Sequence, residues 1–196
     1  TYALGVSYFD QAGILGGDLM GAGYKRFTAR LNSEMVLIKG SSRDIVTFGE
    51  NFTLTNSQNK WVGTGNIYWN DLHNALVVNP LLPAYWDKSP DQYGFTPTLE
   101  GIALGQHNPL AQLFYNRSNF QWAKGNTITG NAYINLEPVK NLKIRSSFGI
   151  NSWFGNSRSW SPTYKLATQY NNSNDAVTQE MYQGINFTLT NTVSYE

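Results

Sequence analysis

The feature of this sequence that most constrains its fold is a two-residue alternation of apolar and polar side chains over long segments. In residues 24–37, for example, Phe27, Ala29 and Leu31 are separated by charged or polar residues. Side chains with this period point to opposite faces of a β-strand, whereas a helix repeats about every 3.6 residues. We predict six such strands, which fall in residues 2–9, 24–37, 45–55, 126–137, 142–154 and 185–195.

The lengths of these segments and of their connections predict the architecture. Strands in soluble proteins usually have about five or six residues, whereas a strand that crosses a bilayer at a tilt needs about 9 to 11. Outer-membrane barrels have short turns on the periplasmic side and long loops outside. The connections here alternate in the same way, being short at 39–44 and 138–141 and long at 11–23, 56–125 and 155–183. We therefore predict an all-β fold, an antiparallel up-and-down meander that is part of a large transmembrane β-barrel with long extracellular loops.

The composition agrees with this architecture and excludes several others. Charged residues make up 14% of the chain, against roughly 25% in typical soluble domains. No apolar run approaches the roughly 18 residues of a spanning helix, and a formal net charge of +1 provides no basic surface for nucleic acid. The absence of cysteine rules out disulfides and thiolate metal sites.

Catalysis and metal binding find no support in the sequence. The 13 acidic residues are scattered, with no pair in a recognisable catalytic motif. The two histidines, His73 and His107, have no metal-ligand spacing. We therefore expect neither an enzyme nor a bound metal or cofactor.

Three charged residues share the polar face of the second predicted strand: Arg26, Arg30 and Glu34. One interpretation is that they line the lumen and contact substrate or a plug domain. The other is that they neutralise one another as a charge ladder in a wet interior. Both interpretations place these side chains away from lipid.

Aromatic residues gather in the longest connection, where they are candidates for binding substrate or a partner. Flat rings with a polar tip suit sugar stacking or a protein interface, although the same rings could pack the loop against itself. These residues are Trp61, Tyr68, Trp69, Tyr85, Trp86 and Tyr93.

The same connection contains one predicted helix. Asn70 is a favourable N-cap, Leu72 and Leu76 follow at helical spacing, and Asn79-Pro80 would end the helix. We expect this helix to shape the mouth of the barrel.

A set of local phrases, taken in order, resembles a known family along essentially the whole chain. The phrases are Tyr8-Phe9-Asp10-Gln11-Ala12-Gly13-Ile14, Tyr24-Lys25-Arg26-Phe27, Arg30-Leu31-Asn32, Tyr93-Gly94, Asn108-Pro109-Leu110-Ala111, Gly130-Asn131-Ala132-Tyr133, Lys140-Asn141-Leu142-Lys143-Ile144-Arg145 and Phe148-Gly149. They resemble the strands, the long outer loop and the following hairpin of the SusC/RagA family of TonB-dependent transporters.

The resemblance implies a function and a set of partners. Such a protein lies in the outer membrane of a Gram-negative cell as a plugged barrel of about 22 strands. It imports oligosaccharides or peptides with a SusD-like lipoprotein, and TonB supplies the energy. Residues 1–196 match part of the barrel, with about six strands and neither a plug domain nor a TonB box. We therefore expect TonB to act through an N-terminal region of the parent protein that is missing here.

A second interpretation uses the same residues without a membrane. In it, the chain is a soluble or secreted β-rich carbohydrate-binding module that binds through its loop aromatics. The two interpretations differ in the surroundings of the apolar rows, which contact lipid in the first and form a dry core in the second.

Overall fold

A computed structural model describes residues 1–15, 22–62, 70–81, 83–85, 108–116, 121–165 and 171–195 of the chain. The elements in chain order are β1 (Tyr2–Ala12), β2 (Gly23–Lys39), β3 (Asp44–Lys60), α2 (Asp71–Val77), α3 (Pro109–Asn116), β4 (Trp122–Leu136), β5 (Leu142–Ser161), β6 (Tyr164–Lys165), β7 (Asn171–Asn172) and β8 (Ala176–Tyr195).

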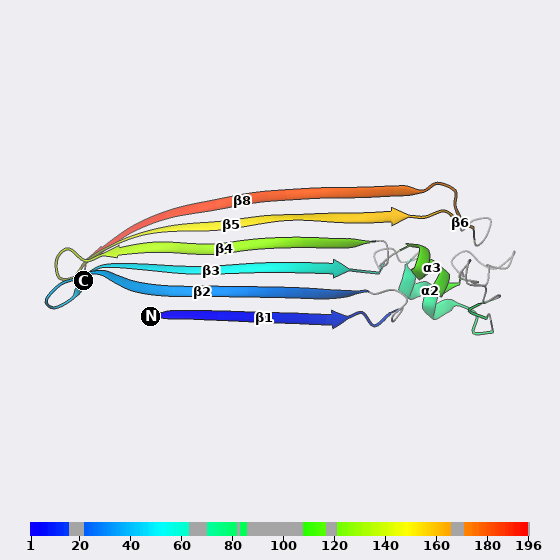
Figure 1. Cartoon of the computed structure of the whole chain (residues 1–196), viewed down its shortest axis with the longest axis horizontal. Helices are drawn as coiled ribbons and strands as arrows, with labels where there is room; N and C mark the ends of the chain where they lie inside the picture. Colours follow the sequence, from blue (N-terminus) through cyan, green and yellow to red (C-terminus); the bar gives the residue numbers. More distant parts are fainter. Residues whose placement is uncertain are drawn as a thin grey trace.

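The six long strands form one antiparallel sheet in the order β1-β2-β3-β4-β5-β8 (Figure 1). The short strands β6 and β7 form a separate two-stranded sheet within the connection between β5 and β8. The two short turns lie at one end of the large sheet, and α2 and α3 lie at the other (Figure 1). The predicted up-and-down meander, with short and long connections at opposite ends, is confirmed.

The strands are longer than the alternation alone predicted. Strand β5 has 20 residues, β8 has 20 and β3 has 17. At the end of β3, residues 56–60 are all polar, so the apolar alternation stops there. Backbone pairing continues, with Asn59 opposite both Tyr24 and Ala123, because ladder hydrogen bonds do not require apolar side chains.

The two short turns are tied together by one arginine. The Arg43 Nε donates a hydrogen bond to the Glu137 carbonyl oxygen at 3.1 Å, and Nη2 donates to that of Pro138 at 2.8 Å. Asn141 adopts a positive φ of 71°, which asparagine tolerates better than most residues. The two Arg43 hydrogen bonds hold both turns together at the same end of the sheet.

Strand β2 departs from the predicted alternation near its end. One register shift lies between Val36 and Ile38, where Val36 opposes Thr47, Ile38 opposes Val46 and Leu37 is the extra residue, and a second lies between Ile38 and Lys39. Alternation predicted Leu37 on the apolar face, but the bulge brings Ile38 opposite apolar Val46 instead. An extra residue in one strand changes which residues share a face, and this change is not visible in a local pattern.

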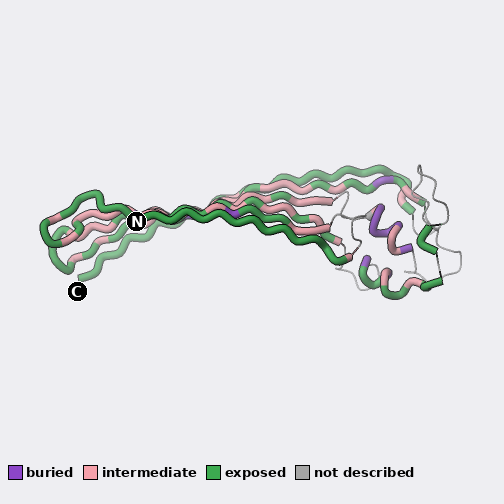
Figure 2. The backbone as a smooth tube through the Cα atoms, turned by 60° about the horizontal axis from the view of Figure 1, so that its bottom comes forward, coloured by how far each residue is buried: buried purple, intermediate pink, exposed green. Residues whose placement is uncertain are grey.

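The sheet is a single layer whose apolar rows are exposed. Leu4 is 74% exposed and Phe187 is 70% exposed, and the strands as a whole are exposed or partly exposed (Figure 2). Among the described residues, the buried hydrophobic side chains are Ala111, Leu113 and Phe114, all in α3. The binding-module interpretation requires a dry core that covers the apolar rows. In this structure the apolar rows are exposed instead.

The predicted helix in the longest connection is present as α2. The Oδ1 of Asn70 accepts a hydrogen bond from the His73 backbone N–H at 2.6 Å, and the helix ends at Val77, before Asn79-Pro80. Helix α3 is not among the elements predicted from the sequence. Neither of these helices is long and apolar enough to cross a membrane, nor is any other in the described ranges.

Candidate functional site on the polar face and the loop end

The polar face of the sheet consists largely of uncharged amides and hydroxyls. Asn32, Asn51 and Asn131 oppose one another across β2, β3 and β4. The Thr129 hydroxyl donates to the Asn151 Oδ1 at 3.2 Å. Since paired residues share a face of a sheet, this face continues across all the central strands.

The structure places Arg26, Arg30 and Glu34 on this polar face, opposite Ser57, Thr53 and Gly49 of β3. No ion pair joins either arginine to Glu34 within the described part of the chain, where Lys25–Asp10 forms the single salt bridge. The Arg26 guanidinium instead lies 5.9 Å from the centroid of the Phe9 ring.

Glu34 is held by a tyrosine that is not among the predicted site residues. The Tyr133 hydroxyl of β4 donates to the Glu34 Oε2 at 2.6 Å, so the tyrosine side chain crosses the whole width of β3. The Arg145 guanidinium of β5 lies 3.8 Å from the centroid of the same ring, a cation–π geometry. Glu34, Tyr133 and Arg145 thus connect three strands that are separate in sequence.

A glycine makes this connection possible. Gly49 is buried beneath the tyrosine, and a Cβ at this position would collide with the Tyr133 ring. The same arrangement recurs on this face, where Trp153 covers Gly184 and Tyr182 covers Gly155. A glycine within a strand often marks a close approach of this kind, so these glycines are the signal in the sequence for the contacts.

The polar face carries an excess of positive charge. Its cations in the described strands are Arg26, Arg30, Lys143 and Arg145, and its acids are Glu34 and Glu180. An open polar surface with these groups suits a hydrated path for solutes with amide, hydroxyl or carboxylate groups.

At the loop end, a buried polar network joins α2 to α3. The Gln112 Nε2 donates to the Asp71 Oδ1 at 2.9 Å, and its Oε1 accepts from the Asn74 Nδ2 at 2.5 Å. All three side chains are buried. A single amide therefore uses its donor and its acceptor to hold two helices together.

Asn108 fixes the start of α3. Its Oδ1 accepts from the backbone N–H groups of Leu110 at 3.1 Å and Ala111 at 3.4 Å, while its Nδ2 donates to the Ala84 carbonyl oxygen at 2.7 Å. Pro109 follows at the first helical position, where its missing N–H is not needed. This cap joins α3 to residues 83–85.

The two loops at this end are also in contact. Tyr115 of α3 stacks on Tyr164 of β6 with ring centroids 4.7 Å apart. Tyr164 packs against the small core around Ala111 and Phe114. The connection between β3 and β4 and the connection between β5 and β8 therefore share one packed unit.

The structure describes two of the six candidate loop aromatics. Trp61, directly after β3, is 40% exposed, and Tyr85 is 42% exposed, so both rings remain accessible. Tyr68, Trp69, Trp86 and Tyr93 lie outside the described residues. No group of three or more potential metal ligands occurs among the residues that are described.

Comparison with known proteins supports the fold. No protein-family model matches the chain, and no curated protein matches it either. Among solved structures, the chain is similar to one titled "Structure of the RagAB peptide importer in the 'open-open' state", with a TM-score of 0.68 and 16% sequence identity. The similarity covers 99% of this chain and 20% of the other, so this chain spans about a fifth of that protein's length. At this identity the likeness is one of fold, and it agrees at that level with the SusC/RagA resemblance.

Proposed function

We propose that this chain forms part of the barrel of an outer-membrane importer, with its apolar face against lipid and its polar face toward the lumen. The observation that carries the proposal is the single-layer sheet, in which six strands expose apolar rows on one face and polar rows on the other. A membrane-spanning barrel uses both faces of such a sheet, because lipid covers the apolar one and water the other.

The proposed cargo is a nutrient, with peptides favoured over oligosaccharides. The solved structure that supports the fold is that of a peptide importer, and the polar face offers arginines that could pair with peptide carboxylates. A SusD-like lipoprotein would sit at the end with the long loops, and TonB would act through a region of the parent protein outside this chain. Both partners follow from the SusC/RagA resemblance.

Site-directed cysteines test the orientation, because residues 1–196 contain no cysteine and labelling above that of the unsubstituted protein reports the introduced thiol. In the protein as its gene encodes it, Ser173→Cys lies in a long connection and Ser42→Cys in a short turn. On intact cells, a membrane-impermeant maleimide should label Ser173→Cys directly and Ser42→Cys only after the outer membrane is permeabilised. The reverse order, or equal labelling of both positions, would exclude the proposed orientation.

Uptake measurements test the cargo. Cells that express the protein should accumulate labelled oligopeptides faster than cells in which the gene is deleted. Accumulation of labelled oligosaccharides alone would move the proposal to glycan import, and accumulation of neither would remove the transport function.

A further inference from the structure

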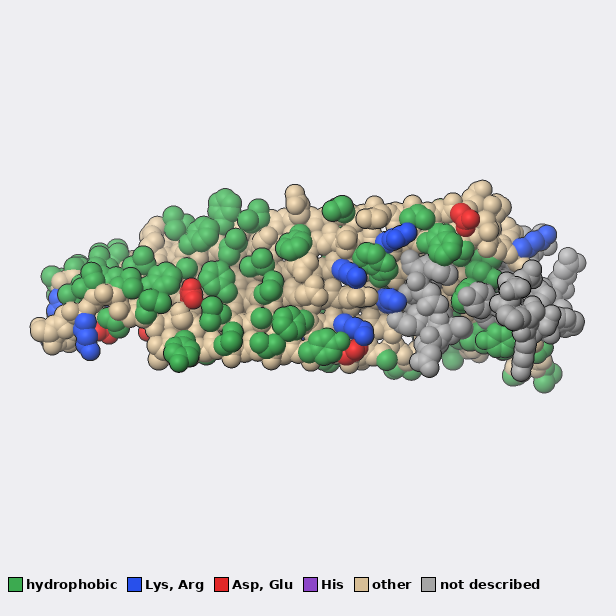
Figure 3. Space-filling view, viewed as in Figure 1, with side chains coloured by type: hydrophobic (Ala, Val, Ile, Leu, Met, Phe, Trp, Pro, Cys, Tyr) green, Lys and Arg blue, Asp and Glu red, His purple; other side chains and the backbone are tan. Residues whose placement is uncertain are grey.

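Four cations lie on the apolar face of the sheet, at its loop end. One row of paired residues crosses β2, β3, β4 and β5, and it consists of Lys25, Gln58, Lys124 and Asn156 in that order. Lys60 and Arg158 follow two residues further along their strands. Figure 3 shows Lys and Arg side chains gathered at this end of the face, beside the area covered by hydrophobic side chains. We refer to Lys25, Lys60, Lys124 and Arg158 as the outer cationic patch.

Among the described residues, one of the four cations of the patch is paired with an acidic side chain. Lys25 pairs with Asp10 through a 3.1 Å contact between Nζ and Oδ2. For Lys60, Lys124 and Arg158, no described acidic side chain forms an ion pair. The Lys124 Nζ lies 5.0 Å from the centroid of the Trp122 ring, and no carboxylate in the described part of the chain pairs with it.

The patch lies directly beside the apolar rows. Ile128 follows Lys124 by four residues on the same face of β4, and Phe154 precedes Arg158 by four residues on β5. Four residues of a strand span about 13 Å, which a tilt of about 40° reduces to about 10 Å of depth, enough to pass from the hydrocarbon core into the roughly 5 to 8 Å of headgroup region in one leaflet. In the proposed orientation, the patch therefore lies at the headgroup level on the side of the long loops.

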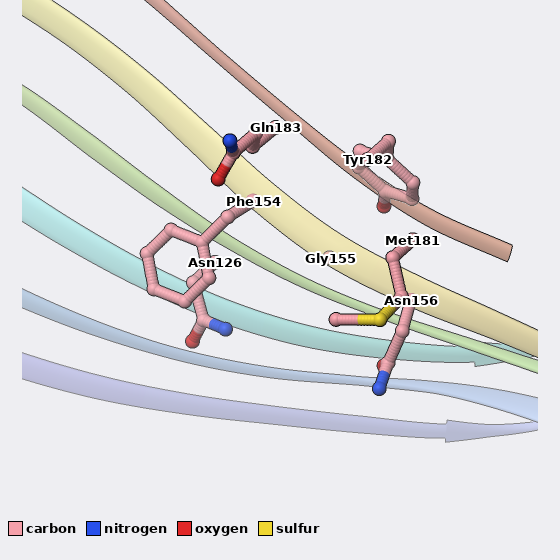
Figure 4. Close-up of a pocket in the computed structure, with 7 residues that line it drawn as sticks. All are labelled: Asn126, Phe154, Gly155, Asn156, Met181, Tyr182 and Gln183. Carbon is pink, nitrogen blue, oxygen red and sulfur yellow. The ribbon is translucent and has the colours of Figure 1, made fainter.

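A hollow beside the patch has both polar and apolar walls. It is lined by the amides of Asn126, Asn156 and Gln183 together with Phe154 and Met181. Figure 4 shows Phe154 and Asn126 at one end of the hollow and Met181 and Asn156 at the other. Asn156 is opposite Lys124 and two residues before Arg158, so the hollow opens next to two cations.

We propose that the outer cationic patch binds the phosphate of a lipid headgroup in the leaflet on the loop side. Lys124 and Arg158 contact the phosphate, and the hollow holds the polar linkage and the first carbons of the acyl chains. Arginine and lysine are the side chains best suited to phosphate oxygens, and the apolar wall excludes a ligand that is charged throughout. This inference rests on the proposed function, because it needs the apolar face to contact lipid.

The test measures which lipids the protein immobilises. The protein as its gene encodes it is reconstituted in phosphatidylcholine vesicles with either spin-labelled phosphatidylglycerol or spin-labelled phosphatidylcholine. Electron paramagnetic resonance then gives the immobilised fraction of each lipid. The double variant K124Q/R158Q should lower the preference for phosphatidylglycerol, by up to about fivefold for each cation removed at low salt.

A matched control removes the same charges from the other face. Lys143 and Arg30 lie on the polar face, so K143Q/R30Q should keep the preference for phosphatidylglycerol. Equal preference in the wild type and in K124Q/R158Q would overturn the proposal. If millimolar inorganic phosphate abolished the preference, the patch would be a site for free phosphate rather than for lipid.

Failure of the inference can be told apart from failure of the proposed function. A protein that does not lie in the bilayer immobilises neither spin-labelled lipid, and this result would remove the proposed function. A protein that immobilises both lipids equally lies in the bilayer but lacks the headgroup site.

Discussion

At the scale of single residues, Gly49 decides whether Tyr133 can cross β3 and reach Glu34. We predict that Gly49→Val displaces the tyrosine and costs about 1 to 3 kcal/mol of unfolding free energy, through overpacking and the loss of the hydrogen bond. Denaturant unfolding of the protein in detergent micelles measures this cost. Gly5→Val is the matched control, because it lies in β1 and a Cβ there would meet nothing within 4 Å. Equal losses at both positions would contradict the role of Gly49.

The contrast between the two faces is also testable at single residues. Leu31 is on the apolar face and its neighbour Asn32 is on the polar face. We predict that Leu31→Arg costs about 2 to 4 kcal/mol near the bilayer midplane, because arginine is unfavourable against lipid there, whereas Asn32→Arg costs little. The free energies of unfolding of both variants in lipid vesicles give the comparison. Equal losses in the two variants would show that the apolar and polar faces are wrongly assigned.

At the scale of elements, α2 and α3 depend on Gln112. We predict that Gln112→Leu, which removes its hydrogen bonds to Asp71 and Asn74, loosens the pair of helices by about 1 kcal/mol or more for each bond. Hydrogen exchange of the α2 amides should become faster while exchange in the strands stays unchanged. Leu76→Ala is the control, since Leu76 is 76% exposed on α2. Unchanged protection of α2 in Gln112→Leu would show that other contacts hold the helices together.

At the scale of the whole molecule, the sheet has two open edges and an exposed apolar face. Strands β1 and β8 each pair on one side only in the described sheet, and such edges favour association. We predict that the 196-residue chain associates in plain buffer and disperses with β-structure in detergent micelles. Size-exclusion chromatography with light scattering and circular dichroism tests this. A folded monomer in buffer would instead favour the binding-module interpretation.

Much of the architecture could be predicted from local patterns. The period-two alternation located the six long strands but not the short strands β6 and β7, the alternating connections predicted the meander, and Asn70 marked the start of α2. These signals are local, because side-chain direction in a strand and the capping of a helix depend on neighbours in the chain.

The contacts that build the candidate site could not be predicted in this way. Tyr133 and Glu34 are 99 positions apart, and Asp71 and Gln112 are 41 apart. No local sequence pattern links residues so far apart. The hydrogen bonds between α2 and α3, and the hydrogen bond from Tyr133 across β3 to Glu34, were therefore indicated in the sequence by nothing more than single glycines and amides.

By itself, the sequence determined the strands, their two faces and the ends where short and long connections lie, because alternation and turn residues act within a few positions. Only the tertiary structure decided the register that brings Tyr133 over Gly49, the bulge at Leu37 and the gathering of four cations at the loop end of the apolar face. The physical reason is that backbone hydrogen bonds between two strands set which residues lie opposite each other. This pairing brings together side chains that are distant in the chain.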